Sequence, residues 1–177
     1  SKEIHNHNLS EDLALLLSTS GTTGTNKFVR ISYKNLNSNA VAIKKYLNIN
    51  HNHKTITTLP FAYSYGMSVI NSHIYSGGTI VITHFSILQK NFWEIFSRYS
   101  ITSFAGVPFT YELLKKIDIK NLDSSHFKYS TVAGGNLDLS SLNFFINRFK
   151  EIDKKLIVMY GQTEASPRIS FLPWSSI

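Results

Sequence analysis

The sequence predicts an α/β protein with a largely parallel β-sheet and helices on both faces of that sheet. Short apolar runs alternate with segments of helical period through most of the chain. The length of 177 residues and the hydrophobic share of 42% suit one domain with its own core. Because right-handed crossovers leave few other ways to bury both kinds of element, this alternation favours a parallel sheet.

Strands are expected where apolar and β-branched residues form short runs bounded by turn residues. The first run ends in a segment rich in Ser, Thr and Gly, which is typical of a buried strand that leads into a loop. The expected strands span residues 13–17, 28–31, 55–59, 79–83, 102–107, 129–133 and 156–160.

Helices are expected where apolar residues recur at spacings of three and four. Ser32 and Asp138 stand before two of these segments as caps, and Pro108 stands where a first helical turn tolerates proline. The expected helices span residues 36–47, 66–75, 88–99, 108–117 and 142–149.

Aromatic residues at helical spacing are predicted to lie in the core: Trp93, Phe96, Phe144, Phe145 and Phe149. Four histidines stand in polar segments without supporting carboxylates or cysteines: His5, His7, His51 and His53. Such residues are expected at the surface, and not as metal ligands.

The formal charge of +7 suits an anionic partner, either a nucleotide or a nucleic acid. The basic residues are scattered and no nucleic-acid motif accompanies them, so no nucleic-acid partner is predicted. No apolar stretch approaches the roughly 20 residues that cross a bilayer. No transmembrane segment and a cytoplasmic location are therefore expected, and no sequence feature specifies an oligomeric state.

The most informative segment, residues 18–27, reads Ser-Thr-Ser-Gly-Thr-Thr-Gly-Thr-Asn-Lys and follows the first strand. Gly21 and Gly24 allow close backbone approach, while amides and hydroxyls can donate to phosphate oxygens and Lys27 adds a positive charge. The glycine-to-lysine spacing of the Walker loop is absent, which disfavours an ordinary NTPase. Read alone, the segment is equally typical of a surface turn.

This loop resembles the phosphate-binding loop of the adenylate-forming superfamily, which comprises acyl-CoA synthetases, peptide-synthetase adenylation domains and luciferases. That loop reads Thr-Ser-Gly-Thr-Thr-Gly-x-Pro-Lys. The match departs at Asn26, which replaces proline, and at Phe28, where a glycine usually follows the lysine. The resemblance implies that the ATP phosphates are held by Thr19, Ser20, Gly21, Thr22, Thr23, Gly24 and Lys27.

A second match lies at residues 160–164, which resemble the family motif Tyr-Gly-x-Thr-Glu. By that resemblance Tyr160 packs on adenine, Thr163 contacts the α-phosphate and Glu164 binds Mg²⁺, and Gly161 also belongs to the nucleotide site. A carboxylate suits a hard cation that neutralises phosphate charge. Together with Lys27, Thr163 and Glu164 are the expected catalytic residues.

Weaker matches fall between these two motifs in the family's order. Residues 59–66 resemble a segment that lines the acyl pocket, with Tyr63 in place of a histidine, and residues 133–136 resemble the stretch beside adenine and the acyl group. The resemblance adds Gly135 and Asn136 to the nucleotide site. The implied acid pocket consists of Tyr63, Ser64, Gly134 and Gly161.

The acid pocket also bears on the substrate class. In amino-acid-activating relatives an aspartate of a Phe-Asp-x-Ser segment neutralises the substrate ammonium, and the counterpart of that aspartate here is Ala62. Because a buried ammonium without a partner is costly, an acid without an α-amino group is predicted.

The function implied by the resemblance is ATP- and Mg²⁺-dependent activation of a carboxylic acid to an acyl adenylate, followed by transfer to a thiol such as coenzyme A. Family members continue past the second motif to a C-terminal domain with a catalytic lysine. Residues 1–177 are therefore expected to form part of an AMP-binding domain that is inactive without the remainder of its parent chain. A peptide-synthetase adenylation domain and a non-catalytic nucleotide-binding module stay open as alternatives.

Overall fold

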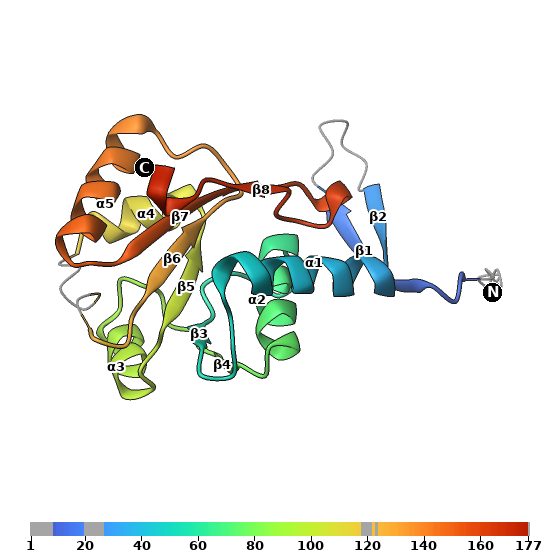
Figure 1. Ribbon diagram of the computed structural model, residues 1–177, viewed down its shortest axis with the longest axis horizontal. Helices are drawn as coiled ribbons and strands as arrows, with labels where there is room; N and C mark the ends of the chain where they lie inside the picture. Colours follow the sequence, from blue (N-terminus) through green and yellow to red (C-terminus); the bar gives the residue numbers. More distant parts are fainter. Residues whose placement is uncertain (1–8, 20–26, 118–121, 123, 177) are drawn as a thin grey trace, which may run out of the picture.

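The computed structural model describes residues 9–19, 27–117, 122 and 124–176. At its centre is a six-stranded sheet with the strand order β4-β3-β5-β6-β7-β8 (Figure 1). All neighbours in this sheet are parallel except β7 and β8, which are antiparallel. The strands are β3 (Lys54–Ile56), β4 (Thr79–Val81), β5 (Ser103–Gly106), β6 (Tyr129–Val132), β7 (Lys155–Tyr160) and β8 (Ser170–Phe171). The predicted α/β class is confirmed.

Helices cover both faces of the sheet, as predicted (Figure 1). On one face lie α1 (Tyr33–Leu47) and α2 (Ser64–Tyr75). On the other lie α3 (Lys90–Arg98), α4 (Pro108–Leu114) and α5 (Leu139–Glu151). The strands β5, β6 and β7 contribute to two separate cores because successive side chains point to opposite faces. In β5, Phe104 belongs to the core under α3 to α5, while Ala105 belongs to the core under α1 and α2.

The core under α3 to α5 is built mainly from aromatic rings. Phe127 lies 5.6 Å from Phe96 and 5.7 Å from Phe104, measured between ring centroids. Of the aromatic residues predicted to be buried, Trp93, Phe96, Phe145 and Phe149 lie in this core. The prediction was wrong for Phe144, which is 49% exposed. Adjacent helix residues point about 100° apart, so Phe145 faces the sheet and Phe144 faces solvent.

The predicted caps are present, but several element ends differ from the prediction. The Ser32 hydroxyl accepts a hydrogen bond from the Asn35 amide at 3.1 Å, and the Asp138 carboxylate accepts one from the Ser141 amide at 2.9 Å. In contrast, Leu88 and Tyr99 lie outside α3 and are exposed. The fourth predicted helix ends earlier than expected, because α4 stops at Leu114. Apolar spacing alone therefore overestimated the length of these two helices.

The first two predicted strands form an antiparallel hairpin that is separate from the main sheet. It consists of β1 (Leu13–Thr19) and β2 (Lys27–Ser32). Leu17 and Ile31 are buried and face Leu36 of α1 and Met67 of α2. The hairpin is therefore fixed to the outer side of the α1–α2 pair by apolar contact.

The structure places two of the four histidines that were predicted to lie at the surface. His5 and His7 lie outside the described residues, and His51 is exposed as expected. The surface prediction was wrong for His53, which is 3% exposed. Its Nδ1 atom lies 3.1 Å from the side-chain oxygen of Asn50.

Within the described ranges, no helix has the length and apolar content needed to cross a bilayer. The cytoplasmic location stays a prediction.

We expect Phe145→Ala to destabilise the fold by about 3–5 kcal/mol because Phe145 is fully buried and its removal leaves a cavity. Phe144→Ala is the matched control, since this neighbour on α5 is half exposed, and should cost less than about 1 kcal/mol. Urea unfolding of both variants measures the difference. Equal destabilisation by the two substitutions would contradict the assigned helix face.

Candidate functional site

A cleft of about 1110 Å³ opens at the carboxyl ends of β6 and β7. Loops after these two strands meet the end of β1 there, so segments far apart in the sequence share one wall. Ligand sites of parallel sheets gather at this edge. The cleft is lined by Ser18, Thr19, Ala62, Tyr63, Val132, Gly134, Gly135, Asn136, Leu137, Leu139, Leu142, Val158, Met159, Tyr160, Gly161, Gln162, Thr163 and Glu164.

The loop after β6 approaches the start of α2 closely at Gly134. This residue has a φ of 80°, in the left-handed region that favours glycine. A Cβ at this position would also overlap the hydroxyl of Tyr63, the residue before α2. Glycine therefore lets this loop form one side of the cleft against Tyr63.

The loop after β7 forms the opposite side of the cleft. Tyr160 ends the strand and is 61% exposed, so its ring is open to a ligand. The 3₁₀ turn η2 (Thr163–Ala165) follows, and the Thr163 hydroxyl donates to the Ser64 hydroxyl at 2.9 Å. This hydrogen bond ties the loop to the first residue of α2. Glu164, next in the turn, lines the cleft and is exposed.

The chain after η2 is held against α1 by contacts that the sequence did not reveal. The Asn39 amide donates to the carbonyl oxygens of Ser166 and Pro167 at 2.9 and 2.6 Å. Tyr46 stacks on Phe171 of β8 with ring centroids 4.3 Å apart. Asn39 is a half-buried polar residue beside the apolar stripe of α1 and matches no motif, so no sequence signal marks its role.

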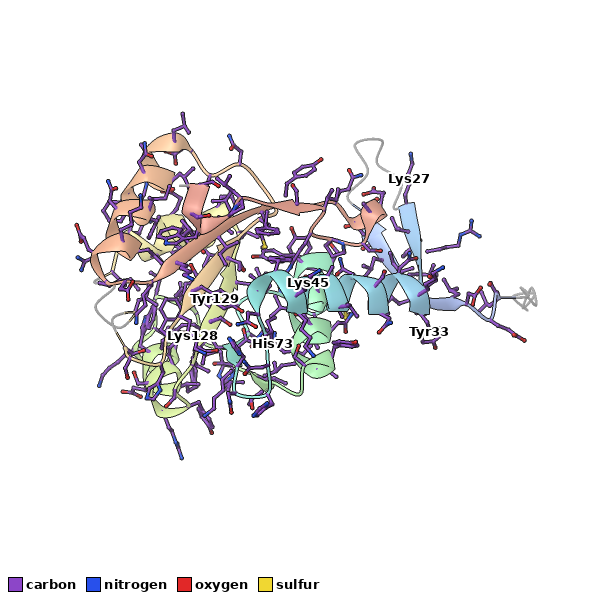
Figure 2. All side chains as sticks on the ribbon, in the orientation of Figure 1. Lys27, Tyr33, Lys45, His73, Lys128 and Tyr129 are labelled. Atoms are coloured by element: carbon purple, nitrogen blue, oxygen red, sulfur yellow. The ribbon has the colours of Figure 1, made fainter. Side chains whose placement is uncertain are left out.

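A layer of polar side chains lies between α2 and the sheet, directly behind the cleft. The hydroxyls of Tyr65 and Thr131 are 2.7 Å apart and connect α2 to β6. His73 of α2 and Tyr129 of β6 are buried, at 3% and 6% exposed (Figure 2). The Nε2 atom of His73 and the Tyr129 hydroxyl form no hydrogen bond with any described residue.

Burial dominates the titration of this polar layer. It lowers the pKa of His73 to about 4, although a hydrogen bond from Nδ1 to the Val69 carbonyl at 2.7 Å opposes the change. Burial raises the pKa of Tyr129 to about 12. The nearby Ser103 side chain on β5 opposes part of this rise, although it is not placed to form a hydrogen bond with the Tyr129 hydroxyl. Both side chains are therefore neutral near pH 7.

Comparison with known proteins identifies the family. The sequence profile described as "AMP-binding enzyme" matches residues 2–176. The chain belongs to this family. An acyl-CoA synthetase of Gibberella moniliformis is 29% identical to this AMP-binding chain over 170 residues, which is 95% of the chain and 30% of that protein. A dimodular nonribosomal peptide synthase of Bacillus subtilis is 26% identical over 166 residues, 90% of the chain and 7% of that protein.

Solved structures share the fold of this AMP-binding chain. The o-succinylbenzoate coenzyme A synthetase of Bacillus subtilis, in complex with ATP and magnesium ion, superposes with a TM-score of 0.76 at 22% identity over 90% of the chain and 32% of that structure. The N-terminal domain of FACL13 from Mycobacterium tuberculosis gives a TM-score of 0.80 at 15% identity over 94% of the chain and 40% of that domain. The chain thus spans about a third of the length of the acyl-CoA synthetase and of the o-succinylbenzoate coenzyme A synthetase.

Most of the site residues predicted from the sequence lie together. Those lining the one cleft are Thr19, Tyr63, Gly134, Gly135, Asn136, Tyr160, Gly161, Thr163 and Glu164, and Ser64 joins them through its hydrogen bond to Thr163. Ser20, Gly21, Thr22, Thr23 and Gly24 lie outside the described residues. Lys27 does not line the cleft: it is exposed at the start of β2, paired in register with Thr19, and points away from α1 (Figure 2).

We expect Gly134→Ala to destabilise this AMP-binding chain by at least about 1–2 kcal/mol, the cost of a left-handed backbone at alanine. The added methyl also overlaps the Tyr63 hydroxyl. Combining it with Tyr63→Phe should recover the part due to overlap and leave the part due to φ. Thermal unfolding of the single and double variants checks this. A Gly134→Ala protein as stable as the wild type would refute the assigned backbone conformation.

Stability should fall as pH is lowered from 6.5 to 4. The pKa of His73 in the folded state is about 4, below its ordinary 6.5, so the unfolded state binds the proton first. His73 alone then costs about 3 kcal/mol by pH 4, and burial also lowers the pKa of His53. His73→Gln should flatten the pH profile of thermal unfolding, whereas the exposed control His51→Gln should not. An unchanged profile in His73→Gln contradicts this assignment.

Proposed function

We propose that this chain supplies the nucleotide-binding part of an AMP-forming ligase that activates a carboxylic acid and passes it to a thiol. The observation that carries the proposal is the cleft in which Tyr160, Thr163 and Glu164 lie with Ser18 and Thr19, the first residues of the hydroxyl-rich segment. Membership of the AMP-binding family supports ATP as the nucleotide. The similarity to acyl-CoA synthetases supports coenzyme A as the thiol.

In this proposal the nucleotide lies along the edge of β6 and β7. The exposed ring of Tyr160 suits stacking on adenine, with Gly135 and Asn136 on the opposite loop. Thr163 has a hydroxyl for the α-phosphate, and the loop from Thr19 to Lys27 has amides, hydroxyls and one cation for the other phosphates. The role of each residue in the nucleotide site is part of the proposal.

Glu164 is the residue suited to hold Mg²⁺. Its carboxylate is exposed on the cleft and forms no ion pair with any residue that the structure describes, so it is free to bind a hard cation. When bound, Mg²⁺ would neutralise charge on the phosphates. The fit of a free carboxylate beside a phosphate-binding segment supports this ligand.

The proposed reaction joins two anions. An oxygen of the acid carboxylate forms a bond to the α-phosphorus while the bond from that phosphorus to the bridging oxygen breaks, and pyrophosphate leaves with the electron pair. Because the reactants repel each other, the protein contributes mainly placement and charge neutralisation. Thr163 and Glu164, which line the cleft, are the groups that we assign to this step. Lys27 lies outside the cleft in this structure and would have to turn toward the phosphates to join them. The thiol then displaces AMP from the acyl adenylate.

The cleft favours an acid without an α-amino group. Ala62 lines the cleft at the position where an aspartate would neutralise an ammonium, and Glu164 is the one carboxylate among the described lining residues. A second candidate is the amino-acid adenylation reaction, which the similarity to a nonribosomal peptide synthase supports. The two candidates differ in the acid that triggers pyrophosphate release.

The test uses the full-length protein and measures acid-dependent release of pyrophosphate from ATP. We expect Glu164→Gln to lower kcat/KM by at least about 100-fold, the usual loss on removing one charge-stabilising group. Glu94→Gln is the control, because Glu94 pairs with Lys90 at the surface of α3. Undiminished release by Glu164→Gln would refute the role of Glu164. Release triggered by α-amino acids alone would support the second candidate, and ATP binding without release would support a non-catalytic module.

A further inference from the structure

A partly buried arginine lies behind the cleft, in the polar layer under α2. Arg168 follows η2 with a φ of 75°. Its Nε donates to the Ser68 hydroxyl at 2.9 Å and its Nη1 donates to the Tyr46 hydroxyl at 3.4 Å. The guanidinium carbon lies 5.1 Å from the centre of the Tyr65 ring. The side chain is thus inserted between α1, α2 and the sheet.

The positive charge of Arg168 has no carboxylate partner among the described residues. The ion pairs in that part of the chain are Lys90–Glu94, Lys115–Glu112 and Arg148–Glu151. Neutral hydroxyls engage two of the guanidinium N–H groups, and the rest find no partner in the described part. The guanidinium is partly exposed, so its positive charge can pair with a carboxylate that a ligand supplies.

The neighbouring titratable groups respond to this unpaired charge. Burial is the main cause of the low pKa of His73, and the charge of Arg168 lowers that pKa further. Burial raises the pKa of Tyr65, and the same charge acts against this rise. The groups facing the guanidinium are neutral hydroxyls and a neutral imidazole, so the polar layer carries a net positive charge.

A small cavity connects Arg168 to the cleft. It has a volume of about 70 Å³, and Arg168 and Tyr65 line it together with Tyr63, Gly134 and Thr163, which also line the cleft. Beside it, the Tyr65 hydroxyl meets the Thr131 hydroxyl at 2.7 Å and joins α2 to β6. The cavity is far smaller than the cleft of about 1110 Å³, so it offers room for a short extension of the substrate.

We propose that Arg168 determines specificity by pairing with a second carboxylate of the substrate, which is a short dicarboxylic acid. One carboxylate lies in the cleft for activation, and the other extends through the small cavity to the guanidinium. The planar guanidinium matches a carboxylate with two parallel hydrogen bonds, which a neutral terminal group cannot replace. The inference rests on the proposed acid-activating function and adds the substrate class.

The test compares acids of equal length in the full-length protein, with pyrophosphate release as the readout. We expect succinate to exceed butyrate, and glutarate to exceed pentanoate, by at least about 100-fold in kcat/KM, because the monocarboxylates leave the cation unpaired. Arg168→Met should remove this preference mainly by raising KM for the dicarboxylic acid. Arg168→Lys should restore part of it, since the charge returns without the planar geometry. Arg148→Met, at a surface ion pair of α5, should leave both acids unchanged.

The wild-type preference needs no variant, so the inference can be tested even if Arg168→Met does not fold. Equal or better use of butyrate by the wild type would overturn it. An Arg168→Met protein that loses activity equally for both acids would also overturn it, because equal loss would indicate that Arg168 only holds α1 and α2 together. Absence of pyrophosphate release with every acid would instead overturn the acid-activating function, which is a distinguishable result.

Discussion

The parallel pairing of β6 with β7 is the constraint on which the site depends. The two strands run in register from Tyr129 beside Lys155 to Val132 beside Val158. Both therefore end at the same edge of the sheet, and the loops that follow them face each other across the cleft. A shift of one residue in this register would turn the inward side chains of one strand outward and move Gly134 away from Tyr63. The ladder is held because both faces of both strands are covered, by aromatic rings on one side and by α1 and α2 on the other.

The hairpin adds the third wall of the cleft by a different kind of interaction. β1 and β2 pair with each other and not with the main sheet, so no backbone ladder places them. Their position depends on apolar contact of Leu17 and Ile31 with α1 and α2. A two-stranded hairpin is marginal on its own, and this packing is what brings Ser18 and Thr19 to the cleft. The hairpin is thus less firmly fixed than the loops after β6 and β7, although it carries the residues proposed for the phosphates.

Much of this architecture could be predicted because it follows from local pattern. The apolar runs, their helical neighbours and the caps at Ser32 and Asp138 are all visible in the sequence and present in the structure. The second motif and the first two residues of the hydroxyl-rich segment, Ser18 and Thr19, also lie at the cleft. What the sequence could not indicate are contacts between distant residues of no special type. Asn39 and Tyr46 hold the chain after η2, and His53 is buried by neighbours that lie far from it in the sequence. The sequence also offered no sign of Arg168, because only the folded structure shows that no described carboxylate lies close enough to pair with it.

The two faces of the sheet perform different tasks, and the alternation of side chains along each strand makes this possible. Phe104 and Leu156 project into the aromatic core, where they gain from burial. Ser103 of β5 and Thr131 of β6 point to the other face, into the polar layer under α2. Polar groups there cost stability, and the Tyr129 hydroxyl and His73 Nε2 are left without partners in the described structure. An apolar layer would be more stable, but it could not hold an unpaired guanidinium next to the cleft. The aromatic core offsets that cost, so the same short strands support both a stable domain and a charged layer beside the cleft.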